Sequence, residues 1–305
     1  MQQYCWLGPP DESGDESDDA WERARDTAVP GVFFEAEANA ESSEEDEALG
    51  NETRVPVDVD GRETHFRLCQ APSAYNGLGG DETGGVLWGA AVVLAEVVSG
   101  MIARNEVTGT FLELGCGCAL ASLAARQAGA DDEVVATDGS KRAVARAKKN
   151  AELNSLRVTC QVLKWGSARV AKAKRSRYDV VMASDAVYTK ECVEPLVETI
   201  ERHARGVVLV SCRDGRPGVE SFVAAMNASF DLMRELKCPP RRTNSVSTTL
   251  AVSHTVYKWR RKARKRGAES DPDMVSPLEN WNDAPAPHWW ELDEEPNPSR
   301  TTQCR

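Results

Sequence analysis

One short stretch, Phe111–Leu120 with the sequence FLELGCGCAL, constrains the fold of this chain more than any other. An apolar run there is followed by two glycines, Gly115 and Gly117, and then by a helix-like segment. A second apolar run ends at Asp138, 23 residues after Gly115. A strand–turn–helix–strand unit with glycines in its first turn is typical of domains that bind an adenosine-bearing cofactor. The sequence therefore predicts an α/β fold in which Asp138 meets the ribose of such a cofactor.

Nicotinamide dinucleotides are the first alternative for this cofactor. Their fingerprint has a third glycine three residues after the second, where this chain has Leu120. A carboxylate at Glu113 would repel a diphosphate, but it suits the cationic end of S-adenosylmethionine. A generic glycine-rich turn is the other interpretation of this motif alone. We expect S-adenosylmethionine as the cofactor, with these contact residues in the motif and after it: Glu113, Gly115, Cys116, Gly117 and Asp138.

The acidity of the chain is concentrated at its N-terminus. The formal net charge is −11, yet residues 1–50 hold 15 Asp and Glu against two Arg, so the rest is close to neutral. Low apolar content predicts that 1–50 is a disordered acidic tail. Residues 261–305 are expected to form a second disordered tail, basic and then Pro-rich. We interpret the basic run at 260–266 as a solvated exit from the last strand, with a nuclear signal or nucleic-acid patch as the alternative.

Neither a membrane span nor a secretory signal is visible in the sequence. No apolar run is long enough to cross a bilayer, and Met1–Trp6 lacks a basic segment followed by an apolar one. The nine cysteines are scattered, which suggests reduced thiols. Cys116 and Cys118 have the wrong spacing for a zinc site, so we expect no metal. We therefore expect a cytoplasmic monomer, with a nuclear location as the alternative.

Ahead of the glycine motif, the sequence predicts a hairpin and a helix. Alternating runs over Arg54–Leu68 flank the turn pair Asp60-Gly61, which places a β-hairpin in an extension over residues 51–82. Apolar residues then recur at helical spacing from Gly84 to Gly100.

From residue 110 onward, strand-like and helix-like runs alternate. Strands are expected over 110–114, 134–137, 158–163, 179–183 and 206–212, and helices over 120–128, 141–153 and 192–204. Alternating βα units predict a parallel sheet covered by helices on both faces. Strands over 230–236 and 248–259 have no helix between them and should form an antiparallel edge pair. The domain at 83–260 is thus expected to be a Rossmann-like, seven-stranded mixed sheet, the architecture of class I methyltransferases.

Candidate residues for the reaction follow the fourth and third strands of this sheet. Ligands of open α/β sheets lie beyond the carboxyl ends of the strands. The fourth strand leads into Asp185 and Tyr188, which should surround one opening. Trp165 closes the third strand at the same edge, where its indole can lie against an adenine face. Trp88 begins the predicted first helix, and on composition alone a core position is its simplest role.

With its motifs in this order, the chain resembles the seven-β-strand protein lysine methyltransferases of the methyltransferase-like 21 type. The resemblance covers about Val57 to Trp259, from the hairpin to a late Tyr-x-Trp. It implies an S-adenosylmethionine-dependent enzyme that methylates a lysine in a protein substrate. It also implies two sets of site residues. Those that would contact the cofactor are Trp88, Gly115, Gly117, Asp138, Trp165 and Ser184, and those that would face the lysine are Asp185 and Tyr188.

Four positions depart from the pattern of that family. Ala119 stands where a third glycine is frequent, and Gly89 stands where a larger or acidic residue is usual. Lys164 replaces a common acid, and Ser184 replaces a small apolar residue. Because Ala119 and Ser184 are small, cofactor binding should survive both changes. Nothing in the sequence explains Lys164.

Two other functions stay open on the sequence. Methyl transfer to histidine, arginine or a small molecule would use the same fold, and a catalytically silent protein-binding module would keep it without the reaction. The intact glycines and Asp185 argue against a silent module. Transfer to a nucleic-acid base is not expected, because Ser184–Tyr188 replaces the Asn/Asp-Pro-Pro-Tyr motif and the core is near neutral, whereas base recognition would predict a clear basic face.

Overall fold

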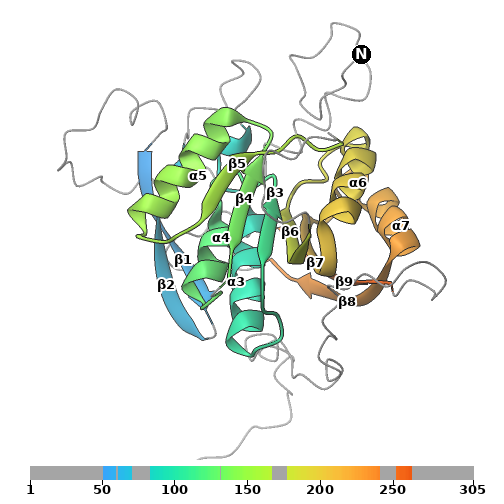
Figure 1. Ribbon diagram of the computed structural model, residues 1–305, viewed down its shortest axis with the longest axis horizontal. Coiled ribbons are helices and arrows are strands. Elements are labelled where there is room, and N and C mark those ends of the chain that lie inside the picture. Colours follow the sequence, from blue (N-terminus) through green and yellow to red (C-terminus); the bar gives the residue numbers. More distant parts are fainter. Residues whose placement is uncertain are drawn as a thin grey trace, which may run out of the picture.

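The computed structural model describes residues 51–59, 61–70, 83–130, 132–166, 177–240 and 252–262. Figure 1 shows how its strands and helices are arranged. The strands are β1 (Asn51–Val59), β2 (Arg62–Gln70), β3 (Phe111–Leu114), β4 (Val134–Asp138), β5 (Thr159–Val162), β6 (Tyr178–Ser184), β7 (Ala204–Arg213), β8 (Phe230–Cys238) and β9 (His254–Arg261). The helices are α3 (Gly89–Ala103), α4 (Leu120–Gln127), α5 (Lys141–Leu153), α6 (Val193–His203) and α7 (Val219–Ser229). Two short 3-10 helices span Thr83–Gly85 and Lys190–Cys192.

The main sheet has seven strands in the order β5-β4-β3-β6-β7-β9-β8. The first five of these are parallel, and β9 runs antiparallel to both β7 and β8. The predicted mixed sheet with a C-terminal antiparallel pair is therefore confirmed. Because β3 has β4 on one side and β6 on the other, the strand order reverses at β3, where open sheets of this kind bind their ligands.

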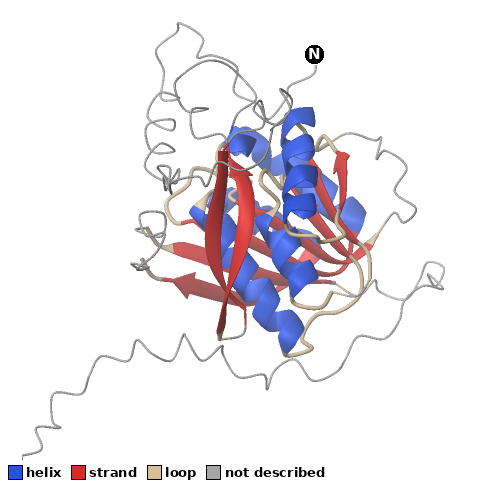
Figure 2. Ribbon diagram, turned by 90° about the vertical axis from the view of Figure 1, so that its left-hand side faces the viewer, coloured by secondary structure: helices blue, strands red, loops and turns tan. Residues whose placement is uncertain are grey.

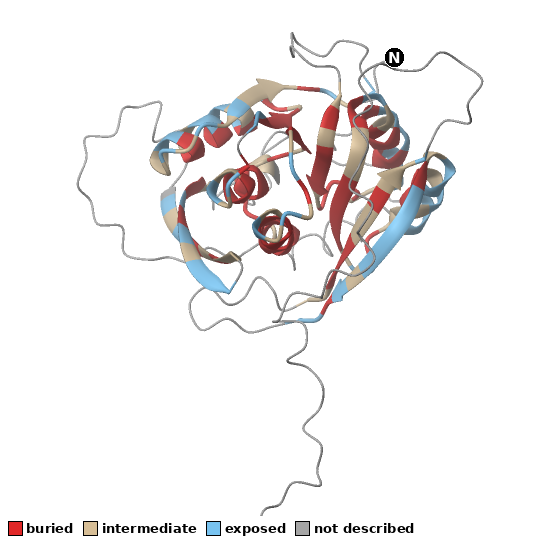
Figure 3. Cartoon of the chain, turned by 60° about the horizontal axis from the view of Figure 1, so that its bottom comes forward, coloured by how far each residue is buried: buried red, intermediate tan, exposed pale blue. Residues whose placement is uncertain are grey.

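Helices cover both faces of the sheet, as expected for a sheet whose strands are mostly parallel. All four residues of β3 are buried. Phe111 packs in the cluster formed with α3 and α4, while Leu112 and Leu114 pack in the cluster formed with α6 and α7. Figure 3 shows this burial along the strands and the inner faces of the helices. Among the described helices, none has the length and apolarity needed to cross a bilayer.

The predicted hairpin forms a two-stranded sheet of its own. β1 and β2 pair antiparallel along their full length, and Gly61 adopts a φ of 77° in the turn between them. Alternate apolar residues of both strands are buried, which packs the hairpin against α3 and α5. Figure 2 shows both strands lying across the helices. Of the predicted turn pair, Asp60 lies outside the described residues.

A buried amide in α5 connects this hairpin to the loop after β3. Asn150 is fully buried, and its side-chain oxygen accepts a hydrogen bond from the Cys69 amide of β2 at 2.6 Å. Its side-chain nitrogen donates to the carbonyl oxygens of Cys69 at 3.4 Å and Cys118 at 3.0 Å. One side chain therefore satisfies backbone groups of two segments that are distant in the sequence.

Several boundaries differ from the sequence predictions. Helix α3 begins at Gly89 rather than Gly84, because residues 83–85 form a separate 3-10 turn. Helix α7 was not predicted, and only Phe222 and Met226 among its residues are buried, so its apolar period is weak. Strand β9 begins at His254, and positions 248–251 of the predicted strand lie outside the described residues. The same holds for the predicted tail over 1–50, for 71–82 of the predicted extension and for the second tail beyond 262.

We predict that Asn150→Ala lowers the free energy of unfolding by about 2–4 kcal/mol, because it leaves buried backbone groups of β2 without their partner. Urea denaturation of the full chain measures this loss. Asn154→Ala is the matched control: Asn154 binds the Arg67 backbone of the same strand, but at the exposed end of α5. Its loss should stay below about 1 kcal/mol. Equal losses for the two variants would contradict the role given to Asn150.

Candidate functional site

The predicted cofactor residues come together at one edge of the sheet. Strands β3, β4 and β6 are parallel neighbours, so their carboxyl ends lie side by side. Gly115 follows β3, Asp138 ends β4 and Ser184 ends β6. Trp165 follows β5, which is the next strand beyond β4 at the same edge. The carboxyl ends of the strands are where open α/β sheets bind their ligands.

Asp138 holds the glycine loop at the end of β4 through hydrogen bonds. Its carboxylate is 5% exposed and accepts hydrogen bonds from the backbone amides of Gly117 at 3.0 Å and Ser140 at 2.9 Å. Ser140 in turn caps α5, since its hydroxyl accepts a hydrogen bond from the amide of Ala143. The carboxylate that the sequence assigns to the ribose therefore also sets the shape of the loop below it.

The loop after β3 takes a backbone path that favours glycine. Gly115 and Gly117 adopt φ values of 69° and 50°, in the left-handed region where a side chain is strained. Ala119, at the position of the missing third glycine, adopts a φ of 62° and caps α4. The chain thus keeps the left-handed conformation at Ala119 without the residue that adopts it most easily.

Close packing around the two glycines leaves little room for side chains. A Cβ atom on Gly115 would lie 2.9 Å from the Trp165 indole. A Cβ atom on Gly117 would lie 3.3 Å from the carbonyl oxygen of Gly84, just before α3. The loop is therefore pressed between the predicted adenine-binding indole and the segment that leads to Trp88. Both glycines have a steric reason that does not require a ligand.

Glu113 is buried behind the loop rather than exposed along it. It has no exposed surface, and its Oε2 atom accepts hydrogen bonds from the Ser122 amide at 3.0 Å and from the Ser122 hydroxyl. Its Oε1 atom has no hydrogen-bond partner among the described residues. Burial raises the pKa of Glu113 to about 7, against the effect of the Ser122 hydrogen bonds. The structure therefore shows Glu113 holding the first turn of α4, and its predicted contact with the cofactor stays a prediction.

Cys116 is packed in the loop and is poorly suited to react. Its side chain lies in a small apolar cluster with Ala119, Ala136 and Ala147. Burial, together with the nearby Asp138 and Glu113 carboxylates, raises the pKa of the Cys116 thiol well above its usual range. A protonated thiol is a weak nucleophile. Cys116 can therefore shape the cofactor loop, but not attack a substrate.

Asp185 forms a buried ion pair with an arginine that the sequence analysis did not identify. The Arg216 Nη2 atom lies 2.8 Å from Asp185 Oδ2, and its Nε atom lies 3.2 Å from Oδ1. The two side chains are 5% and 4% exposed. The Arg216 guanidinium also lies 5.6 Å from the centroid of the Trp88 ring. The pair thus joins the end of β6, the start of α3 and the loop after β7.

One signal in the sequence could have identified Arg216. It lies three residues after the end of β7, in the loop that emerges at the same edge of the sheet as Asp185. A basic residue there can reach an acid that follows the neighbouring strand. Because Arg216 and Asp185 are 31 residues apart in the sequence, no local pattern indicates this pairing.

The other predicted residues at this end keep part of their surface open. Ser184 and Tyr188 are half-buried, on either side of the buried Asp185. Lys164, for which the sequence suggested no role, is exposed next to the half-buried Trp165. The roles predicted for Asp185 and Tyr188 in facing a substrate stay predictions.

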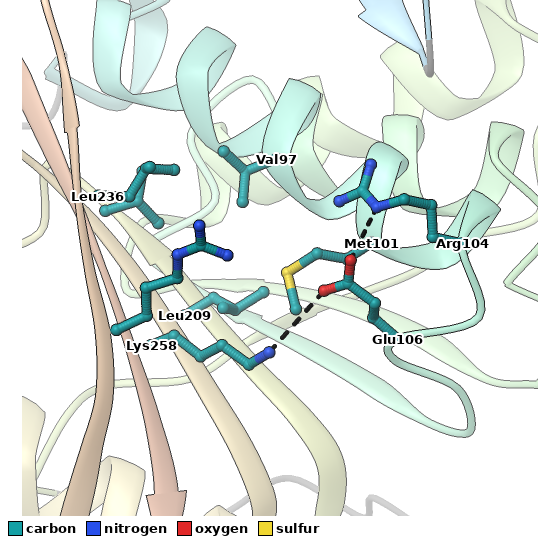
Figure 4. A pocket seen from close by; sticks show the side chains of 9 residues that line it. Val97, Met101, Arg104, Glu106, Leu209, Leu236 and Lys258 are labelled. Carbon is teal, nitrogen blue, oxygen red and sulfur yellow. Dashed lines mark hydrogen bonds and ion pairs between the residues drawn. The ribbon is translucent and has the colours of Figure 1, made fainter. Parts of the chain in front are cut away.

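A pocket on the α3 face of the β7-β9-β8 strands lies apart from these residues (Figure 4). Glu106 bridges two basic side chains of its wall, with 2.7 Å to Arg104 and 3.9 Å to Lys258. The remaining lining residues are Val97, Met101, Leu209, Arg234, Leu236 and Val256. None of these residues belongs to the predicted site, so the pocket is not part of it.

Comparison with known proteins assigns the fold and site to a family. The sequence model described as lysine methyltransferase matches residues 75–229, about half of the chain. The chain belongs to the lysine methyltransferase family. This match confirms the family predicted from the motifs, and S-adenosylmethionine as the cofactor.

Two relatives named as protein-lysine N-methyltransferases agree with the family match. The human protein-lysine N-methyltransferase EEF2KMT is 31% identical over 157 residues, which cover 47% of this chain and 45% of the relative. Protein-lysine N-methyltransferase EFM3 of Chaetomium thermophilum is 29% identical over 179 residues, 53% of this chain and 51% of the relative. A solved ribosomal protein L11 methylase from Lactobacillus delbrueckii subsp. bulgaricus is 22% identical, with a TM-score of 0.39 over 56% of this chain and 78% of that one. The chain spans about half the length of the two lysine methyltransferases.

The residues at the carboxyl edge fit the cofactor of the lysine methyltransferase family. A carboxylate offers about four lone-pair directions, so Asp138 can accept ribose hydroxyls while it holds the loop amides. The indole of Trp165 lies over the glycine loop, where an adenine would need an apolar face. The cofactor would thus be held by Asp138, Trp165 and the backbone of the glycine loop.

We predict that Glu113→Gln removes a pH dependence from the stability of the chain. The pKa of Glu113 is about 7 in the folded protein, against an ordinary value of 4.5, so its stabilising contribution is present below pH 4.5 and is lost as the pH rises to 7. A neutral Gln should gain on the order of 3 kcal/mol over the unaltered chain across this window. Urea denaturation at pH 5 and pH 8 measures the gain. Glu152→Gln, at an exposed position of α5, is the control, and parallel curves for all three proteins would refute the prediction.

We predict that Asp138→Ala weakens S-adenosylmethionine binding by about 1–3 kcal/mol, because hydrogen bonds between ribose and a charged group are lost. Calorimetry of the full chain with the cofactor measures the change. Ser140→Ala removes the cap of α5 but keeps the carboxylate, so its affinity should stay close to that of the unaltered chain. An unchanged affinity in Asp138→Ala would remove Asp138 from the cofactor site.

Proposed function

We propose that this chain transfers the methyl group of S-adenosylmethionine to the side-chain amine of a lysine in a protein substrate. The main support is the family match over residues 75–229, which contains the glycine loop, Asp138, Asp185 and Tyr188. The two relatives described above carry the name protein-lysine N-methyltransferase. Together these observations favour lysine over histidine, arginine or a small molecule as the acceptor.

The reaction requires the lysine as a neutral amine. A free lysine has a pKa near 10.4, so presenting it without its proton at pH 7 costs about 4.6 kcal/mol. Bound S-adenosylmethionine supplies an electrophilic methyl group on a positively charged sulfur. Desolvation of the lysine between the half-buried Ser184 and Tyr188 would lower its pKa.

Two side chains of this chain are placed to orient the amine. Tyr188 offers an aromatic wall and a hydroxyl that can accept or donate a hydrogen bond. Asp185 offers carboxylate oxygens at the end of β6, next to the predicted cofactor edge. Holding the amine in line with the methyl group is then the main catalytic contribution, because it replaces a random encounter by an aligned one.

Labelled methyl transfer tests this proposal. The full chain is incubated with S-adenosylmethionine carrying a labelled methyl group and with cell extract, and the labelled protein is analysed by mass spectrometry. We expect the label on the ε-amine of a lysine. Label on histidine, arginine or a small molecule would overturn the proposed acceptor, and no label at all, with cofactor binding intact, would indicate a silent binding module.

Variants at Tyr188 test whether the labelled lysine binds at the predicted acceptor site. Tyr188→Ala should slow the transfer by on the order of 10–100-fold at unchanged cofactor affinity, because a wall of the acceptor site is lost. Tyr188→Phe is the matched control, which keeps the ring and removes only the hydroxyl. If the Ala variant transfers at the full rate, the acceptor binds elsewhere.

A further inference from the structure

We propose that Arg216 is a positioning residue that fixes Asp185 and cancels its charge, so that the site receives the acceptor lysine as a neutral amine. This inference rests on the proposed function, methyl transfer to lysine. It gives Arg216 a role that the sequence did not suggest, and it resolves a conflict in the site. An isolated carboxylate beside the acceptor would favour the charged ammonium form, which cannot accept a methyl group.

The geometry of the pair is suited to fixing the carboxylate. Two nitrogen atoms of Arg216 bind the two oxygens of Asp185, in the fork arrangement that holds a carboxylate in one plane. The backbone of Asp185 is held as well, since its amide donates to the carbonyl oxygen of Ser211 at 2.8 Å. Asp185 adopts a φ of 48°, in the left-handed region that is strained for a non-glycine residue. Such strain at a buried ion pair is typical of positions that the surrounding structure holds in place.

The two opposite charges of the pair also affect the pKa of the acceptor lysine. A carboxylate within 4–6 Å of a lysine raises the lysine pKa by about one unit or more, and a guanidinium at a similar distance lowers it. With both charges present the two effects largely cancel. The oxygens of Asp185 still have lone-pair directions that can accept an N–H from a neutral amine. Asp185 can therefore aim the acceptor without keeping it protonated.

Other titratable groups around Asp185 do not replace this compensation. On β9, His254 is 2% exposed, and burial lowers its pKa against the opposing effect of Asp185 and Asp214. On β7, burial raises the pKa of Cys212, so its thiol stays protonated. Arg213, the last residue of β7, donates its backbone amide to Asp185 Oδ1 at 3.5 Å, and its side chain is opposite in sign to that of the next residue, Asp214.

The arginine also links the acceptor end to the cofactor end. Its guanidinium lies 5.6 Å from the ring centroid of Trp88, which caps the N-terminus of α3. A guanidinium at this distance from an indole is held by a cation–π interaction. Because Trp88 belongs to the set of residues expected to contact S-adenosylmethionine, Arg216 fixes Asp185 relative to the cofactor and not only to β7.

Single-turnover rates between pH 6 and pH 10 test the proposal. The full chain is used in excess over the extract protein labelled above, so that the bound lysine determines the rising limb of the profile. Arg216→Gln leaves the carboxylate uncompensated and should move the midpoint of this limb up by about one pH unit. Asp185→Asn leaves the guanidinium uncompensated and should move it down by a similar amount. A role in folding alone would not produce shifts of opposite sign.

Two further variants serve as controls. Arg216→Lys keeps the charge and loses the fork, so the midpoint should stay near that of the unaltered chain while the plateau rate falls. Arg205→Gln breaks a similar two-point pair, with Asp179 at 2.7 and 2.9 Å, at the opposite end of β6. It should lower the melting temperature and leave the midpoint unchanged.

The outcomes separate this inference from the proposed function. If a melting experiment shows that Arg216→Gln is not folded, the pH midpoints of Asp185→Asn and Arg216→Lys still test the inference. Lysine methylation with superimposable profiles, or with shifts of one sign, would overturn the inference alone. No lysine methylation by the unaltered chain would overturn the proposed function, and the inference with it.

Discussion

The hydrogen bond from the Gly117 amide to the Asp138 carboxylate is the contact on which the candidate site depends. It joins the loop after β3 to the end of β4, at the point where the strand order reverses. The same carboxylate binds Ser140, whose hydroxyl caps α5, and α5 carries the Asn150 amide that holds the loop and the hairpin. Buried polar groups are stable only when their partners are in place, so this chain of contacts makes the shape of the loop a property of the whole domain.

Three acidic residues at or near the ends of neighbouring strands have been given three different environments. Asp138 accepts hydrogen bonds from two backbone amides, and its carboxylate has further lone-pair directions for other donors. Glu113 is buried with one oxygen on Ser122, and burial raises its pKa to about 7. Asp185 is held by Arg216. The environment of each carboxyl group, more than its position in a motif, thus decides whether it can bind a ribose, support a helix or face an amine.

The sheet, its mixed parallel and antiparallel character and the edge that carries the site could be predicted from the sequence, because a short, mostly apolar strand such as β3 is followed directly by glycines. It could not locate α7, whose two buried residues leave no clear period. Asn150 escaped notice because it lies among charged residues in α5 and its partners are 32 and 81 residues away. Arg216 was not predicted either, because its partner Asp185 lies 31 residues away in the sequence. Local patterns predict elements, whereas contacts between polar side chains from separate loops depend on how the elements pack.

Each end of β6 carries an aspartate–arginine ion pair, and the two pairs have different roles. At its start, the pair of Asp179 and Arg205 is about 30% exposed. Burial alone would raise the pKa of Asp179, but the hydrogen bonds from Arg205 and Thr110 hold it below its usual range. That pair favours the charged carboxylate, and it connects β6 to the residues before β3 and after α6.

At the carboxyl end, the pair of Asp185 and Arg216 is more deeply buried, its aspartate has a left-handed backbone, and its arginine lies over Trp88. Removing charges of both signs from water is costly, and a well-packed apolar pair would serve stability as well. A buried, strained ion pair at the ligand edge is therefore better explained by what it does to the charge of an acceptor than by what it adds to the stability of the fold.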